Sequence, residues 1–187
     1  KTIDAFLVGG SLITSGSISK TVSYIKSRSN IPVCLFPGNF QQIELEADSI
    51  LFLSLISGRN SDFLIGNQIL AAPILYNSSI EVIPTGYILV DGGKTTTANY
   101  MSNTLPIPSD KPEIAFATAL AGQMLGMKCM YFDCGSGAVN SISPNFLSSF
   151  SQKIKTPIIV GGGIRDENTA NELFKSGATA IVIGNAA

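Results

Sequence analysis

The chain has 187 residues, of which 45% are hydrophobic and only 13% charged, as expected for a globular protein with a sizeable core. The net charge of −1 offers no basic field for nucleic acid, so we expect no nucleic-acid partner. The absence of histidine excludes a Ser-His-Asp triad, a Cys-His dyad and a histidine-bearing zinc site. Catalysis must therefore rely on carboxylates, hydroxyls, lysine, arginine, backbone amides or an oxygen-ligated metal ion.

Seven short apolar runs, each followed by turn-forming residues, predict β-strands. They lie at 5–8, 33–36, 50–53, 82–90, 130–133, 157–160 and 180–183. Most of these runs are continuously apolar, which is typical of parallel strands buried on both faces.

Helix signals occupy the segments between these runs. Ser17 and Asp166 are good N-caps, and Pro112 and Pro144 suit the first turn of a helix. We predict helices over 17–28, 112–125, 144–154 and 166–177. The strand–helix alternation predicts a parallel sheet of the α/β class, specifically a TIM (β/α)8 barrel that forms one domain over residues 1–187.

The segment from 54 to 79 is less regular, because it contains Gly58, Gly66 and Pro73 among apolar residues. A helix there is expected to be short or interrupted. Two interpretations remain open for it: an ordinary outer helix with a loop, or a wall for an elongated apolar substrate.

Three cysteines, at positions 34, 129 and 134, show no paired spacing, so we expect buried thiols, no disulfide framework and a reducing compartment. No apolar run reaches the roughly 18 residues of a membrane span, and no signal peptide is visible. We therefore expect a cytoplasmic protein without a membrane anchor.

Glycines at the ends of the last two strands favour a phosphate site. Gly161-Gly162-Gly163 lies between a strand and a helix, and Gly184-Asn185 follows the next strand. In phosphate-binding barrels these are the loops after strands seven and eight. Glycine lets backbone amides approach phosphate oxygens, and a helix N-terminus adds partial positive charge. Tight turns without a ligand are the alternative.

The run Tyr131-Phe132-Asp133-Cys134-Gly135-Ser136-Gly137-Ala138 is the most distinctive of the chain. Alternation along a strand places Tyr131 and Asp133 on one face and Phe132 on the other. If the first face points into the barrel, a carboxylate stands at the catalytic rim, where it can hold a substrate hydroxyl or accept its proton. The alternative is an aspartate that caps the following turn.

This run resembles the Tyr-x-Glu-x-Gly-Ser-Gly-Ala signature of geranylgeranylglyceryl phosphate synthases and the related heptaprenylglyceryl phosphate synthases. Further stretches resemble motifs of the same family, in the same order. They are Val8-Gly9-Gly10-Ser11, Ser54-Leu55-Ile56-Ser57-Gly58-Arg59-Asn60, Pro84-Thr85-Gly86-Tyr87, residues 159–165 and residues 183–185.

The resemblance implies a magnesium-dependent prenyltransferase of ether phospholipid biosynthesis. In that family the C3 hydroxyl of sn-glycerol 1-phosphate attacks C1 of a prenyl diphosphate, here geranylgeranyl diphosphate, and diphosphate leaves. Carried over by position, Tyr131 and Asp133 are the catalytic residues, and Ser11 contributes a hydroxyl ligand to Mg2+. Glycerol phosphate is expected to bind Tyr131, Phe132, Asp133, Cys134, Gly135, Ser136, Gly137, Gly162, Gly163, Gly184 and Asn185. Relatives commonly assemble, so a homo-oligomer is expected.

The chain departs from the family pattern at three places. It begins near the family's second strand and stops soon after Gly184-Asn185, so we expect a fragment without the first strand and the last helix. Asp133 replaces the family's glutamate and is one methylene shorter. Two other functions remain open: another phosphate-binding barrel enzyme, such as a sugar-phosphate isomerase or epimerase, and a non-catalytic phosphate-binding module.

Overall fold

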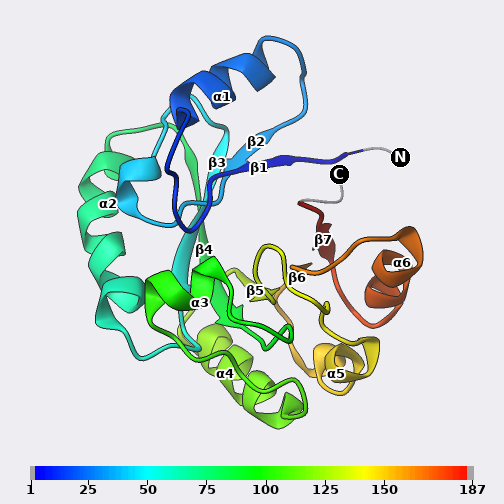
Figure 1. Ribbon diagram of the computed structural model, residues 1–187. Coiled ribbons are helices and arrows are strands. Elements are labelled where there is room, and N and C mark those ends of the chain that lie inside the picture. The colour runs from blue at the N-terminus through cyan, green and yellow to red at the C-terminus, as the bar shows by residue number, and fades with distance from the viewer. Residues whose placement is uncertain (1–2, 185–187) are drawn as a thin grey trace.

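Seven parallel strands form a single sheet in the computed structural model, which describes residues 3–184. The strands follow one another across the sheet in chain order, and the sheet curves into an open half-barrel (Figure 1). They are β1 (Phe6–Val8), β2 (Val33–Leu35), β3 (Ser49–Leu55), β4 (Glu81–Leu89), β5 (Cys129–Asp133), β6 (Ile158–Gly161) and β7 (Ala180–Val182).

Most helices lie along the outside of the curved sheet, whereas α3 lies in front of β4 in this view (Figure 1). They are α1 (Ile18–Lys26), α2 (Asn67–Tyr76), α3 (Thr97–Ser102), α4 (Pro112–Met124), α5 (Pro144–Ser148) and α6 (Glu167–Lys175). None of the helices within residues 3–184 combines the length and the apolar character that a transmembrane span requires.

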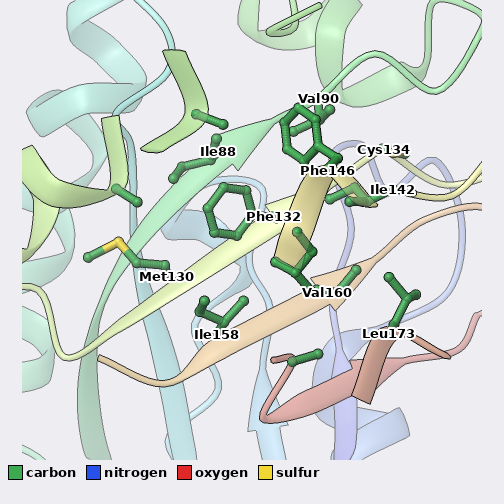
Figure 2. Close-up of a cluster of buried hydrophobic side chains, with 14 of the residues drawn as sticks. Ile88, Val90, Met130, Phe132, Cys134, Ile142, Phe146, Ile158, Val160 and Leu173 are labelled. Carbon is green, nitrogen blue, oxygen red and sulfur yellow. The ribbon is translucent and has the colours of Figure 1, made fainter. Parts of the chain in front are cut away.

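Alternation along the strands separates an outer core from an inner one. The outer core packs β4 to β7 against the helices, and Phe132, Val160 and Leu173 are fully buried within it (Figure 2). The inner core lines the concave side of the sheet and includes Leu51 and Tyr131. The two faces of one strand therefore differ in role, since the outer face packs against the helices and the inner face lines the barrel.

The predicted strands are confirmed, with bounds shifted by at most two residues. Both expected N-caps are present, because the side chain of Ser17 accepts from the amide of Lys20 and that of Asp166 from the amide of Thr169. The three cysteines are buried and free, as expected.

The helix predicted over 144–154 is wrong in its length. Helix α5 ends at Ser148, and a 3-10 turn, Ser151–Lys153, follows. Hydroxyls of Ser148 and Ser149 donate to carbonyls of the preceding turn, at Asn145 and Phe146. Serine side chains that compete for backbone groups in this way weaken a helix. The short helix α3 was not predicted.

The irregular segment forms an interrupted helix, as its glycines and proline indicated. A π-helical turn, Asp62–Gly66, leads directly into α2, which contains Pro73. Phe63, Gln68 and Ala71 from this segment line an apolar pocket that also includes Leu51 and Leu53 of the inner face. Ala71 and Leu75 of α2 also pack in a core with β1, β2 and β3, so the segment is both an outer helix and a wall of the pocket.

Candidate functional site

The carboxylate of Asp133 lies at the C-terminal end of β5, on the concave face of the sheet. Its side chain is only 5% exposed. The hydroxyl of Tyr87, from β4, donates to Oδ2 over 2.5 Å, and the amide of Gly135 donates to Oδ1 over 2.7 Å. A carboxylate has about four lone-pair positions, so these two bonds fix its orientation and leave acceptor capacity for a ligand.

Burial raises the pKa of Asp133, while the bonds from Tyr87 and from the amide of Gly135 oppose that rise. Burial also raises the pKa of Tyr87 well above its ordinary value, and the neighbouring Asp133 charge adds to the effect. The hydroxyl of Tyr87 therefore remains a donor at neutral pH. Asp133 is a stronger proton acceptor than an exposed aspartate would be.

Three aromatic rings form the inner wall beside this carboxylate. The Tyr131 ring lies 4.9 Å from that of Phe36 and 5.5 Å from that of Tyr87, measured between centroids. A Cβ on Gly161 would collide with the Tyr131 hydroxyl, so this glycine of β6 makes room for the phenol. Tyr131 and Asp133 thus share the inner face, as strand alternation predicted.

The glycine loops after β5 and β6 meet at Asp133. Gly162 has a φ of +81°, and a Cβ placed on it would lie 2.8 Å from Asp133 Oδ1 and 2.7 Å from the amide nitrogen of Gly135. Gly163 has a φ of +72°, and a Cβ placed on it would lie 2.4 Å from the carbonyl oxygen of Asn140. Only glycine suits this combination of positive φ and close contact.

Four backbone amides in these two loops have no acceptor within residues 3–184: those of Ser136, Gly137, Gly162 and Gly163. Ser136 and Gly137 are exposed, and Gly162 and Gly163 are half-buried. Free amides grouped around a concave rim suit the oxygens of a phosphate. The geometry therefore provides an anion site immediately beside Asp133.

The other predicted binding residues differ in how they can contribute to this site. Phe132 and Cys134 belong to the outer core, so only their backbone can serve the site. Gly184 is exposed, with open space where its Cβ would stand. Asn185 lies outside the described residues.

An apolar pocket opens next to the site. Tyr87 and Ser11 line it together with Phe36, and the pocket continues past Leu53. Its other lining residues are mostly apolar and come from β3, α2, α3 and the loop after β2. Because Tyr87 touches both the pocket and Asp133, an apolar ligand in the pocket would end beside the carboxylate.

The described residues do not build a metal site of their own. No cluster of three or more metal-ligating Cys, Asp or Glu side chains occurs within residues 3–184. Ser11, the predicted metal ligand, lines the pocket and is half-buried. Its hydroxyl could supply one oxygen ligand.

Two residues of this site were not identified from the sequence. Tyr87 was noted only within the run 84–87, although the parallel register places Tyr87 beside Tyr131. Arg165 was included only within the run 159–165, but its guanidinium donates to the carbonyls of Ala138, at 2.7 Å, and Val139, at 3.1 Å. Arg165 therefore holds the loop after β5 against the loop after β6.

Comparison with known proteins agrees with this arrangement. The sequence model of the PcrB family matches residues 1–187. Geranylgeranylglyceryl phosphate synthase of Spirosoma linguale is 51% identical over 183 residues, which cover 98% of this chain and 74% of that protein. The protein of the same name from Chitinophaga pinensis is 50% identical over 184 residues, which cover 98% and 73%.

A solved structure is also similar. The (S)-3-O-geranylgeranylglyceryl phosphate synthase of Thermoplasma acidophilum, in complex with its substrate sn-glycerol-1-phosphate, superposes with a TM-score of 0.91 at 34% identity. The match covers 98% of this chain and 74% of that one.

The fit of Gly162 to the anion site can be tested with a matched pair of substitutions. Gly126, after α4, has a similar φ of +88°, but open space where a Cβ would stand. We expect Gly126→Ala to cost about 1–2 kcal/mol of unfolding free energy and to leave phosphate binding intact. Gly162→Ala should cost roughly 2–5 kcal/mol and abolish binding of inorganic phosphate. Denaturant unfolding and titration calorimetry measure both effects, and equal binding by the two variants would refute the site.

The raised pKa of Asp133 predicts how stability depends on pH. A carboxyl whose folded-state pKa is raised loses its contribution to stability as pH rises through that pKa, because the charged form is penalised by burial. Asp133→Asn cannot ionise. The unfolding free energy of this variant, relative to the wild type, should therefore increase as pH rises from below the ordinary carboxyl value of 3.8. A difference that shrinks with rising pH would show that Asp133 is stabilised in its charged form.

Proposed function

This chain belongs to the PcrB family, and on that premise we propose that it joins sn-glycerol 1-phosphate to geranylgeranyl diphosphate through an ether bond. The observation that carries the proposal is the meeting of Asp133, an apolar pocket and four amides that lack an acceptor among residues 3–184, all at one rim of the half-barrel. A phosphate, a hydroxyl and a long apolar tail are the three groups that such a site can bind together.

Glycerol phosphate fits the polar half of the site. Its phosphate would accept from the amides of the loops after β5 and β6, including those of Gly137 and Gly162. Its glycerol hydroxyls would then reach Asp133 and the hydroxyl of Tyr131, which has no partner within the described residues. The similar Thermoplasma acidophilum enzyme was solved with sn-glycerol-1-phosphate, which supports this choice of ligand.

The prenyl chain fits the apolar half. The pocket from Tyr87 past Leu53 to Ala71 is lined mostly by apolar side chains, and burial of a polyprenyl tail there gains roughly 25 cal/mol per Å² of apolar surface. The diphosphate end would remain at the rim near Ser11. This orientation brings C1 of the prenyl group towards the glycerol hydroxyl.

The reaction follows from this placement. The oxygen of the C3 hydroxyl forms a bond to C1 of the prenyl group, the bond from C1 to the diphosphate oxygen breaks, and inorganic diphosphate leaves. Asp133 orients the hydroxyl and accepts its proton. Tyr87 positions the carboxylate for this step, because its hydroxyl holds Oδ2 while the amide of Gly135 holds Oδ1.

Mg2+ is proposed as the cofactor because the donor set suits an ion shared with the substrate. Mg2+ commonly keeps several waters and binds substrate phosphates together with few protein oxygens. The hydroxyl of Ser11 can provide such an oxygen at the pocket. When bound, the ion would neutralise charge on the departing diphosphate.

We also propose that the chain acts as a homo-oligomer in the cytoplasm. The free, buried thiols suit a reducing compartment. Met124 and Leu125, at the end of α4, are 77% and 75% exposed, and a second copy could cover them. Sedimentation equilibrium measures the assembly, and Leu125→Glu should shift it towards monomer. A purely monomeric wild type would remove this part of the proposal.

Incubation of the protein with sn-glycerol 1-phosphate and radiolabelled geranylgeranyl diphosphate tests the function. We expect a labelled ether product that disappears with EDTA, returns with Mg2+ and falls by about 100-fold in Asp133→Asn. Ser11→Ala should raise the Mg2+ concentration needed for half-maximal product without changing the KM for glycerol phosphate. A folded wild type that makes no product with Mg2+ would contradict the proposal.

A further inference from the structure

A lysine at the rim of the half-barrel has no part in the chemistry described so far. Residues 92–96, after β4, read Gly-Gly-Lys-Thr-Thr, and the side chain of Lys94 is exposed. This β4 loop lies against the glycine loop after β5 and is attached to it at both of its ends.

The first attachment is formed by the backbone of Gly92. Its carbonyl accepts from the amides of Val139, at 2.9 Å, and Asn140, at 3.0 Å. A Cβ on Gly92 would lie 2.7 Å from the Cβ of Ala138, so the two loops are packed without space for a side chain. The N-terminal end of the β4 loop is thus fixed to the far end of the glycine loop.

The second attachment is formed by Thr96, the N-cap of α3. Its amide and its hydroxyl both donate to Oδ1 of Asn99, at 2.9 and 2.7 Å, and this capping box fixes the threonine side chain. The side chain of Thr96 fills the space that a Cβ on Gly135 would need. Gly135 is the residue whose amide holds Asp133, so this attachment reaches the catalytic carboxylate itself.

Lys94 lies between these two attachments. Its Nζ stands 3.9 Å from the position of a Cβ on Gly137, whose amide has no acceptor in the part of the chain that the structure describes. Within residues 3–184, no carboxylate pairs with Lys94 and no hydrogen bond engages its ammonium group. The nearby cation Arg165 already donates to the carbonyls of Ala138 and Val139.

A cation beside this site would favour phosphate binding for a simple electrostatic reason. The Asp133 carboxylate stands next to Gly162 and repels a phosphate dianion bound there. Neutral amides offset only part of that repulsion, and Arg165 is already engaged. An ammonium group beside Gly137 opposes the repulsion directly and adds a charge-assisted hydrogen bond.

We propose that Lys94, held over Gly137 by the two attachments of the β4 loop, binds the phosphate of the glycerol phosphate substrate. The inference rests on the proposed function for the identity of that substrate. Lys94 would then recognise a phosphate monoester and not the diphosphate of the prenyl donor.

The test is a calorimetric titration of the full chain with inorganic phosphate and with sn-glycerol 1-phosphate. Lys94→Gln removes the charge, Lys94→Arg keeps it, and Lys20→Gln removes one positive charge from the exposed face of α1 as the control. We expect Lys94→Gln to weaken both ligands by about 10-fold and Lys94→Arg to weaken them much less. Lys20→Gln should bind like the wild type. The loss in Lys94→Gln should shrink as salt is added.

Product formation by the same proteins separates the two proposals. With both substrates, Lys94→Gln should raise the KM for glycerol phosphate and leave that for the prenyl diphosphate unchanged. If Lys94→Gln binds phosphate as Lys20→Gln does, or if only the KM for the prenyl diphosphate rises, the inference is wrong although the enzyme is a prenyltransferase. If the wild type makes no ether product, and Lys94→Gln binds phosphate more weakly than the wild type does, the proposed function fails and the role of Lys94 stands. A wild type that binds neither phosphate ligand overturns the inference.

Discussion

A buried carboxylate at the end of β5 is the group on which the rest of the site depends. Asp133 receives one hydrogen bond from Tyr87 on the neighbouring strand and one from Gly135 in its own loop. It is in contact with Gly162 from the strand on the other side. Three adjacent strand ends are therefore arranged around a single charge. Because burial of that charge is unfavourable, the surrounding groups must remain in register for the site to exist.

The register of the parallel strands brings these three strand ends together. Leu89 of β4, Asp133 of β5 and Gly161 of β6 are direct neighbours across the sheet. The loop after each strand therefore starts from the same level of the barrel. The outer core, with Phe132 behind the site, fixes the strands from the other side. The functional rim is thus supported from behind by fully buried side chains.

The glycines at the rim lower the stability of the loops but leave their backbone amides accessible to a ligand. Gly135, Gly162 and Gly163 all have positive φ, and side chains on them would fill space that neighbouring residues now occupy. The same absence of side chains leaves amides uncovered where an anion can reach them. Contacts outside the pocket compensate, since Arg165 bonds to two carbonyls of the loop after β5 and Thr96 packs on Gly135.

Patterns local to the chain predicted much of this structure. The seven strands, the caps at Ser17 and Asp166 and the common face of Tyr131 and Asp133 follow from local periodicity and cap chemistry, which act over a few residues. Which of the two strand faces points into the barrel was not decided by that periodicity. The pairing of Tyr87 with Asp133 joins positions 46 residues apart, so it depends on a register that no local pattern contains. The same holds for Arg165, whose partners are 26 and 27 residues away. The early end of α5 depended on serine hydroxyls competing for backbone carbonyls, which residue type alone did not decide.

The most direct measurement is a crystal structure of this protein with sn-glycerol 1-phosphate. We expect phosphate oxygens within hydrogen-bond distance of the amides of Gly137 and Gly162, and a glycerol hydroxyl on the carboxylate of Asp133. A ligand bound away from these two loops, or bound there with its hydroxyls turned away from Asp133, would contradict it.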